Sequence, residues 1–106
     1  MAKNTMKNIK IVTLCGSRKF MKEFNETEIF LTKKGFAVLS PIFCDKSDIT
    51  KEMIQSMGKI HLKKIELSDE IFVIDVNRYI GESTIKEIEY AKFQNKQIRY
   101  YSIEIM

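Results

Sequence analysis

One stretch of this chain, residues 79–91 (YIGESTIKEIEYA), carries residue types that could do chemistry at the start of a helix. It follows an apolar run at 71–76, and Gly81 supplies a bend. Thr84 and Glu87 have the spacing of a capping box, which predicts that Glu87 lies in the first helical turn. The helix dipole and the free N–H groups of that turn favour a negative charge. An ionised carboxylate there is a candidate nucleophile or base, and the alternative is a pair of capping residues with no further role.

A second candidate is the turn Gly16-Ser17-Arg18, which follows an apolar run at 8–15 and opens an expected helix at 19–34. Backbone N–H groups, the Ser17 hydroxyl and the Arg18 guanidinium could hold a phosphate or a sugar hydroxyl. The sequence has neither the Gly-x-Gly-x-x-Gly of dinucleotide sites nor the Gly-Lys-Ser/Thr of triphosphate loops. The alternative is a tight turn with an exposed arginine.

These two loops are positioned by strands and helices that alternate along the chain. Strands are expected at 8–15, 36–40, 71–76 and 97–103, and helices at 19–34, 50–67 and from the 79–91 stretch to about 95. Such alternation predicts an α/β, three-layer, flavodoxin/Rossmann-like fold: a four-stranded parallel sheet in the order 2-1-3-4 with helices on both faces. The crevice should lie where the first and third strands end, between the two loops.

Further polar residues accompany these loops. His61, the single histidine, falls on a helical stripe with Ile54, Met57 and Ile65, so it is either a packed core residue or a catalyst. Asp75 ends the third strand and is expected to point towards or just below the crevice, where it or His61 could assist a leaving base, with Tyr79 and Glu82 on the loop beyond. Since there is no second histidine and no grouped cysteine, we expect no metal and no cofactor. The two cysteines, Cys15 and Cys44, are expected to be free thiols in a reducing compartment.

Composition limits the class of protein. With 106 residues, 44% hydrophobic and 30% charged, the chain is expected to form one ordinary globular domain, residues 1–106, with a flexible tail at 1–7. The lysines behind the net charge of +4 are scattered, which mildly favours anionic small ligands and argues little for nucleic-acid polymers. No apolar run has membrane-spanning length, and the N-terminus lacks a signal-peptide core. A cytoplasmic protein without membrane association is therefore expected.

Four segments, IVTLCGSRKF, GFAVLSP, IHLKKIELSDEIFVIDV and YIGESTIKEIEYA, resemble the nucleoside 2-deoxyribosyltransferase-like superfamily. The resemblance runs from Ile9 to about Tyr101, and it is greatest for a small branch with a Gly-Glu-Ser-Thr signature. It implies that Glu87 attacks the anomeric carbon of a nucleoside, expels the base and leaves a glycosyl ester. Water or an acceptor base then resolves that ester.

The resemblance also implies roles for the loops. The 16–18 turn would contact the sugar or its 5′ group, and the 81–84 loop would contact a phosphate. The expected catalytic residues are thus Glu87, His61 and Asp75. The expected substrate-binding residues are Cys15, Gly16, Ser17, Arg18, Tyr79, Gly81, Glu82, Ser83 and Thr84.

Three departures from the family pattern affect the expected activity. His61 stands where many members have an Asp, and a histidine can also donate or accept a proton. Gly81 takes the place of an acidic loop residue, with Glu82 following. The chain also ends soon after the fourth strand, which favours a nucleotide N-glycosidase, a hydrolase, or a ligand-binding relative over a base-exchanging transferase.

Two functions from different classes follow. The first is an enzyme that cleaves or transfers at the N-glycosidic bond of a nucleoside or nucleoside 5′-monophosphate. The second is a non-catalytic sensor that binds a nucleotide-derived ligand in the same crevice. A homodimer is expected in either case, because Ile85, Ile88, Tyr90 and Phe93 make the last helix apolar around much of its circumference.

Overall fold

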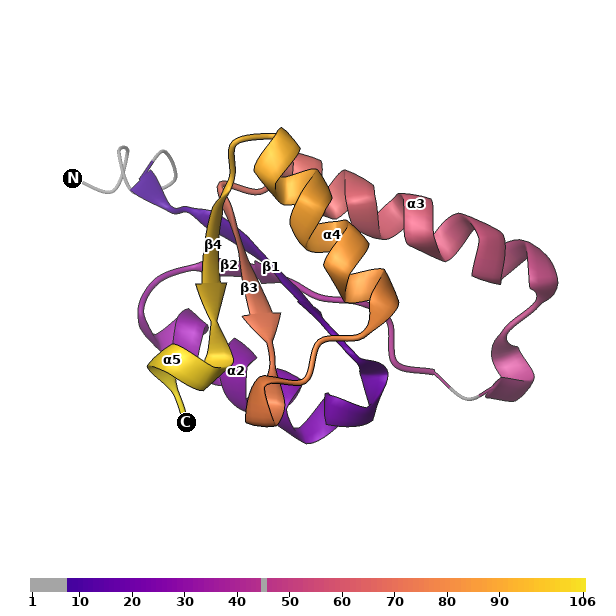
Figure 1. Ribbon diagram of the computed structural model, residues 1–106, viewed down its shortest axis with the longest axis horizontal. Helices are drawn as coiled ribbons and strands as arrows, with labels where there is room; N and C mark the ends of the chain where they lie inside the picture. Colours follow the sequence, from indigo (N-terminus) through magenta and orange to yellow (C-terminus); the bar gives the residue numbers. More distant parts are fainter. Residues whose placement is uncertain (1–7, 45) are drawn as a thin grey trace.

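The four strands of the protein form one parallel sheet in the order β2-β1-β3-β4 (Figure 1). The structure, a computed structural model, describes residues 8–44 and 46–106, so the tail expected at 1–7 lies outside the described residues. The predicted strand order and the parallel pairing are confirmed. The strands are β1 (Ile11–Gly16), β2 (Ala37–Leu39), β3 (Glu70–Ile74) and β4 (Gln97–Tyr100).

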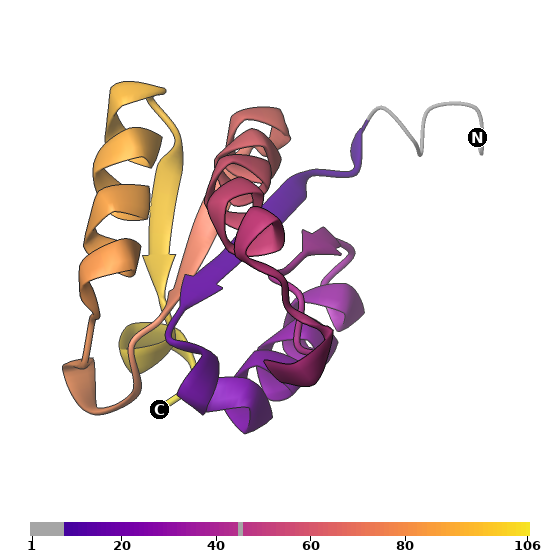
Figure 2. The ribbon, with the colours of Figure 1, turned by 90° about the vertical axis from the view of Figure 1, so that its right-hand side faces the viewer.

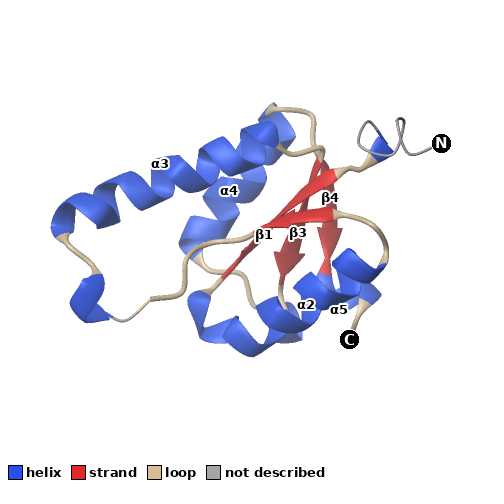
Figure 3. Ribbon diagram, turned by 180° about the vertical axis from the view of Figure 1, so that it is seen from behind, coloured by secondary structure: helices blue, strands red, loops and turns tan. Residues whose placement is uncertain are grey.

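Helices cover both faces of this sheet, as predicted. α2 and α5 lie on one face, and α3 and α4 lie on the other (Figure 3). Three-residue 3-10 turns precede the first three long helices: η2 (Arg18–Phe20), η3 (Lys46–Asp48) and η4 (Val76–Arg78). The α-helices are α2 (Met21–Lys33), α3 (Lys51–Leu67), α4 (Glu82–Phe93) and α5 (Tyr101–Glu104).

None of these helices, within the described part of the chain, is long and apolar enough to span a membrane. The cytoplasmic location expected from the sequence stays a prediction.

The central strands are apolar on both sides because successive side chains of a strand point to opposite faces. In β1, Leu14 packs against the α2 and α5 layer, and the adjacent Cys15 packs against the α3 and α4 layer. Phe72 and Val73 divide in the same way in β3. The register pairs Leu14 with Phe72 and Gly16 with Ile74, so both strands end at the same edge.

Gly16 ends β1 at a place where no side chain fits. A Cβ there would lie 3.0 Å from Ile74 Cβ, 3.1 Å from Ile74 O and 3.3 Å from Phe24 Cζ. Gly81 is different, because a Cβ would meet nothing closer than the Tyr79 hydroxyl at 3.5 Å, and its φ of −79° suits any residue. The idea that the bend at position 81 requires glycine is therefore wrong.

The fourth strand is shorter than expected: it ends at Tyr100, and α5 replaces the predicted strand residues 101–103. Asp75 accepts hydrogen bonds from Ser102 N at 2.8 Å and Ser102 Oγ at 2.7 Å, which holds the chain in this turn. Arg99 donates to both carboxylate oxygens of Glu104 and ties α5 back to β4. The contact with Asp75 joins residues 27 positions apart, and together with the local Arg99–Glu104 pair it overrides the strand propensity of the segment.

α3 projects beyond the sheet at its N-terminal end (Figure 1; Figure 2 is viewed from that end). Thr50 caps it as predicted, accepting from Met53 N at 3.1 Å. Ile65, near its C-terminus, is fully buried against the sheet, whereas Ile54 is 63% exposed. The helical stripe of Ile54, Met57, His61 and Ile65 is therefore buried at its C-terminal end and exposed at its N-terminal end.

Candidate active site

A cleft of about 770 Å³ opens at the carboxyl ends of β1 and β3. It is the place where a doubly wound sheet binds its ligands. Ten of the residues singled out in the sequence line it: Gly16, Ser17, Arg18, His61, Tyr79, Gly81, Glu82, Ser83, Thr84 and Glu87.

The remaining cleft residues escaped the sequence reasoning. The projecting half of α3 and the loop after β2 supply them: Pro41, Ile42, Ile54, Met57, Gly58, Ile60 and Lys64. Of these, Ile54 and Met57 had been assigned to the helical stripe that was expected to face the core. A signal was nonetheless available, because α3 is longer than the strands and its first turns have no sheet to cover.

Glu87 lies in the second turn of α4, not in the first. The helix begins at Glu82 with Gly81 as its N-cap, and Gly81 O accepts from Ile85 N at 3.0 Å. The predicted capping box is therefore wrong, because Thr84 is already inside the helix. Thr84 is buried, and its Oγ1 has no hydrogen-bond partner among the described residues.

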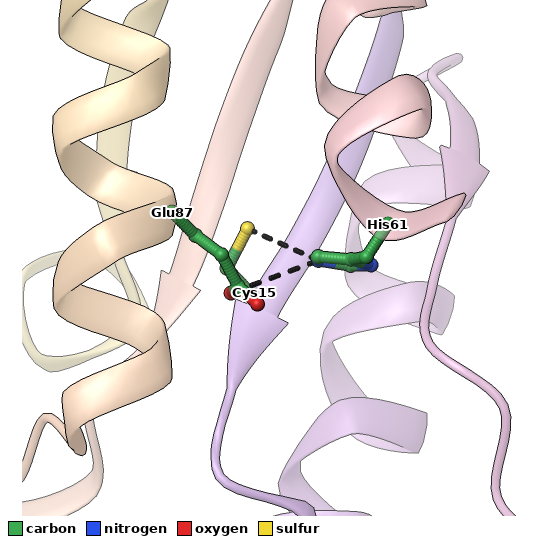
Figure 4. Close-up of side chains that lie close together, drawn as sticks. All are labelled: Cys15, His61 and Glu87. Carbon is green, nitrogen blue, oxygen red and sulfur yellow. Dashed lines mark hydrogen bonds and ion pairs between the residues drawn. The ribbon is translucent and has the colours of Figure 1, made fainter. Parts of the chain in front are cut away.

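Three side chains from three elements meet beside the cleft (Figure 4). Cys15 Sγ, at the end of β1, lies 3.5 Å from His61 Nε2 of α3. The same nitrogen lies 3.7 Å from Glu87 Oε1 of α4. Cys15 is fully buried and does not itself line the cleft, so it touches the cleft only through the other two.

Burial dominates the electrostatics of these three groups. It raises the pKa of Glu87 to about 7, against a hydrogen bond from the Cys15 thiol that acts in the opposite direction. Burial, followed by the charge of Lys64, lowers the pKa of His61 to about 4. Burial also raises the pKa of the Cys15 thiol, and the Glu87 carboxylate raises it further. The expectation that the helix terminus keeps Glu87 ionised is thus wrong, since Glu87 is near its midpoint at neutral pH.

Asp75 does not reach the cleft. It is 5% exposed, and its two oxygens are engaged by Ser102 on the α5 side of the sheet. The expectation that Asp75 faces the crevice and assists a leaving base is wrong. The physical reason is the bend after β3, where Asp75 leaves the extended conformation and turns its side chain towards α5.

The turn after β1 has structural contacts of its own. Ser17 Oγ accepts from Lys19 N at 3.4 Å, and Arg18 Nη2 donates to Ile42 O at 2.7 Å, which fixes the loop after β2 over the cleft. Lys19 Nζ lies 3.7 Å from the centre of the Tyr79 ring, so the turn also holds the loop after β3. The two loops expected to form the crevice are therefore linked to each other.

The fold is that of known 2-deoxyribosyltransferases. The 2-deoxyribosyltransferase of the psychrotolerant bacterium Bacillus psychrosaccharolyticus is similar over 85% of this chain and 70% of its own, with a TM-score of 0.67 and 20% identity. A 2-deoxyribosyltransferase of Leishmania mexicana is similar over 86% of this chain and 63% of its own, with a TM-score of 0.65 and 16% identity. No family model and no curated protein matches the sequence. The chain thus has a nucleoside 2-deoxyribosyltransferase-like fold.

Proposed function

We propose that this protein cleaves or transfers at the N-glycosidic bond of a nucleoside or nucleoside 5′-monophosphate, with Glu87 as nucleophile. The observation that carries the proposal is the place of Glu87. Its carboxylate borders the cleft at the carboxyl edge of the sheet, in a fold whose solved neighbours are named as 2-deoxyribosyltransferases.

In the proposed reaction a Glu87 oxygen forms an ester with the anomeric carbon as the bond from that carbon to the base breaks. The base leaves with the electron pair and takes up a proton. Water then adds to the anomeric carbon in a hydrolase, or an acceptor base does so in a transferase, and the carboxylate is released. His61 is neutral at neutral pH, so its proposed part is to orient Glu87 Oε1 rather than to act as a strong acid.

The walls of the cleft suit the two ends of such a substrate. Ile54, Met57 and Ile60 of α3 offer an apolar surface for a planar base. On the opposite side, Ser83 and the Thr84 hydroxyl, which has no partner among the described residues, offer hydrogen bonds to a sugar or phosphate oxygen. The backbone of the turn at 16–18 is proposed to hold the 5′ end.

The test is a screen of nucleosides and nucleoside monophosphates for released base, with two matched variants. Glu87→Gln keeps the size of the side chain but cannot form the ester, whereas Glu89→Gln changes an exposed carboxylate on the same helix. We expect wild type and Glu89→Gln to release base and Glu87→Gln to lose at least about a thousandfold in rate, or about 4 kcal/mol of transition-state stabilisation. Equal rates in folded Glu87→Gln would refute the nucleophile.

The sensor remains the second candidate, and one observation favours it. Burial raises the pKa of Glu87 to about 7, which makes its carboxyl harder to ionise than an ordinary one, whereas a nucleophile must be ionised. Binding of a nucleotide by wild type and Glu87→Gln, with no release of base by either at pH 8, would establish the sensor.

Assembly is a separate proposal. On α4, Phe93 is 80% exposed and Ile85 is 46% exposed, so part of the apolar surface of this helix has no cover within the described chain. We propose that a second copy covers it in a homodimer. A monomeric mass by light scattering at high protein concentration would contradict this.

A further inference from the structure

The cluster of Cys15, His61 and Glu87 has the composition of a metal site as well as that of a catalytic one. Thiolate, imidazole and carboxylate are the three protein ligands that zinc takes. Each comes from a different element, β1, α3 and α4, and the three ligand atoms lie within 4.8 Å of one another. No short motif of the sequence joins them, which is why the sequence alone indicated no metal.

Two of the three distances between the ligand atoms agree with zinc coordination. Zn–S bonds of about 2.3 Å and Zn–N bonds of about 2.0–2.1 Å, at a tetrahedral angle, place sulfur and nitrogen roughly 3.5 Å apart. Cys15 Sγ and His61 Nε2 are 3.5 Å apart. The same construction places nitrogen and oxygen roughly 3.4 Å apart, and His61 Nε2 and Glu87 Oε1 are 3.7 Å apart.

We propose that Cys15 Sγ, His61 Nε2 and a Glu87 carboxylate oxygen bind a thiophilic divalent cation, Zn²⁺, with the fourth position open to the cleft. On binding, the Cys15 thiol loses its proton to solvent and the sulfur forms the bond to the metal. No oxidation or reduction takes place.

Charge gives an independent reason for a cation at this place. Within residues 8–44 and 46–106, the half-buried carboxylate of Glu87 has no lysine or arginine within 4.0 Å, and the imidazole beside it, that of His61, is neutral at neutral pH. By contrast Glu70, which is also buried, is paired with Arg99 at 2.9 Å. A divalent cation would offset the charge of Glu87 and of a Cys15 thiolate together.

Metal binding is a property separate from the proposed function, and it would inhibit the proposed reaction. Zinc and the anomeric carbon would compete for the same carboxylate of Glu87, so the zinc-loaded protein would not form the glycosyl ester. This consequence rests on the proposed function, whereas metal binding itself does not. A measurement of binding therefore separates the two.

The experiment uses full-length, tag-free protein and Co²⁺ as a spectroscopic substitute for Zn²⁺. The chain has two cysteines, so Cys44→Ser leaves Cys15 as its only thiol. We expect Cys44→Ser to bind one Co²⁺ with a near-ultraviolet thiolate-to-cobalt charge-transfer band like that of wild type, and Zn²⁺ to remove that band. Cys15→Ala and His61→Asn should each weaken Zn²⁺ binding by about 100-fold or more in a chelator competition.

The outcomes are decisive even if a variant does not fold. Absence of the charge-transfer band in wild type and Cys44→Ser would overturn the proposal without any change at Cys15. If only Cys44→Ser lacked the band, the thiol ligand would be Cys44 instead of Cys15, and the proposed site would be wrong. Unchanged Zn²⁺ affinity in folded Cys15→Ala would also overturn the proposal. A wild type that releases no base when metal-free, and that shows the band once Co²⁺ is added, would refute the proposed function and support the metal site.

Discussion

Buried polar groups on the two faces of the sheet differ in whether they have hydrogen-bond partners. On the α2 and α5 face, each oxygen of Asp75 accepts a hydrogen bond from Ser102, and the Tyr101 hydroxyl donates to Glu26 at 2.7 Å. On the α3 and α4 face, His61 Nδ1 and Thr84 Oγ1 are buried without a partner among the described residues. Pairing makes the first face a rigid support.

The two atoms without a partner on the α3 and α4 face belong to His61 and Thr84, which line the cleft. Since buried polar groups are normally satisfied, these two atoms are exceptions among the described residues. Two carboxylates in one small domain thus differ in role because of their neighbours. Asp75 holds a turn, whereas Glu87 borders the cleft beside Cys15 and His61.

The largest expected effect contrasts those two carboxylates. Glu87→Gln should abolish release of base, whereas Asp75→Asn should retain it within about threefold, because Asp75 touches no cleft residue that handles substrate. The measurement is the rate of base release by both variants, each first shown to be folded by circular dichroism. A comparable loss of rate in folded Asp75→Asn would show that the two carboxylates do not differ in role.

The next effect concerns pH and the opposing shifts of His61 and Glu87. In the unfolded chain His61 binds a proton below its ordinary pKa of 6.5, but in the folded chain it does so only below about 4. Its contribution to stability is therefore lost as pH falls from 6.5 to 4. Glu87 ionises near 4.5 when unfolded and near 7 when folded, so its contribution is lost as pH rises through that range.

Between pH 4.5 and 6.5 these two slopes should cancel in metal-free wild type. Glu87→Gln should then lose stability on acidification, and His61→Asn should lose it as pH rises, each by up to about 3 kcal/mol over its full range. Urea unfolding of the three proteins at several pH values measures this. Parallel pH profiles in all three would show that burial does not control the two groups.

Glycine substitutions test the edge where the cleft begins. Gly16→Ala should destabilise the protein by about 1–3 kcal/mol, because its methyl group would press on Ile74 and Phe24. The matched control is Gly58→Ala, within α3, where a Cβ meets nothing within 4 Å. That change should stabilise by about 0.5–1 kcal/mol through helix propensity. Thermal unfolding reports both, and a neutral Gly16→Ala would contradict the close approach of β1 to β3.

The smallest expected effect is on the α2 and α5 face of the sheet. Tyr101→Phe removes one hydrogen bond, that to Glu26, and should lower the free energy of unfolding by about 0.5–1.5 kcal/mol with no change in release of base or in Co²⁺ binding. Chemical denaturation measures the first quantity. A change in either activity would show that the two faces are coupled.

The sequence by itself determined the layered fold and the edge that carries the site. Alternating strand and helix patterns, with the right-handed crossover rule, fixed the order β2-β1-β3-β4 and placed the loops after β1 and β3 together. These are properties of local periodicity and chain connectivity, so one sequence is enough to read them. The importance of Glu87 came from residue types near a helix start and from a family resemblance.

Only the tertiary structure decided what surrounds each polar group. Cys15, His61 and Glu87 are far apart in the chain, and only the packing of α3 and α4 on β1 makes them neighbours. The same packing buries Glu87 and raises its pKa, whereas local reasoning from the helix dipole gave the opposite direction. It likewise turned Asp75 towards α5 and ended β4 at Tyr100. Burial and long-range partners are properties of the assembled chain, so no local pattern encodes them.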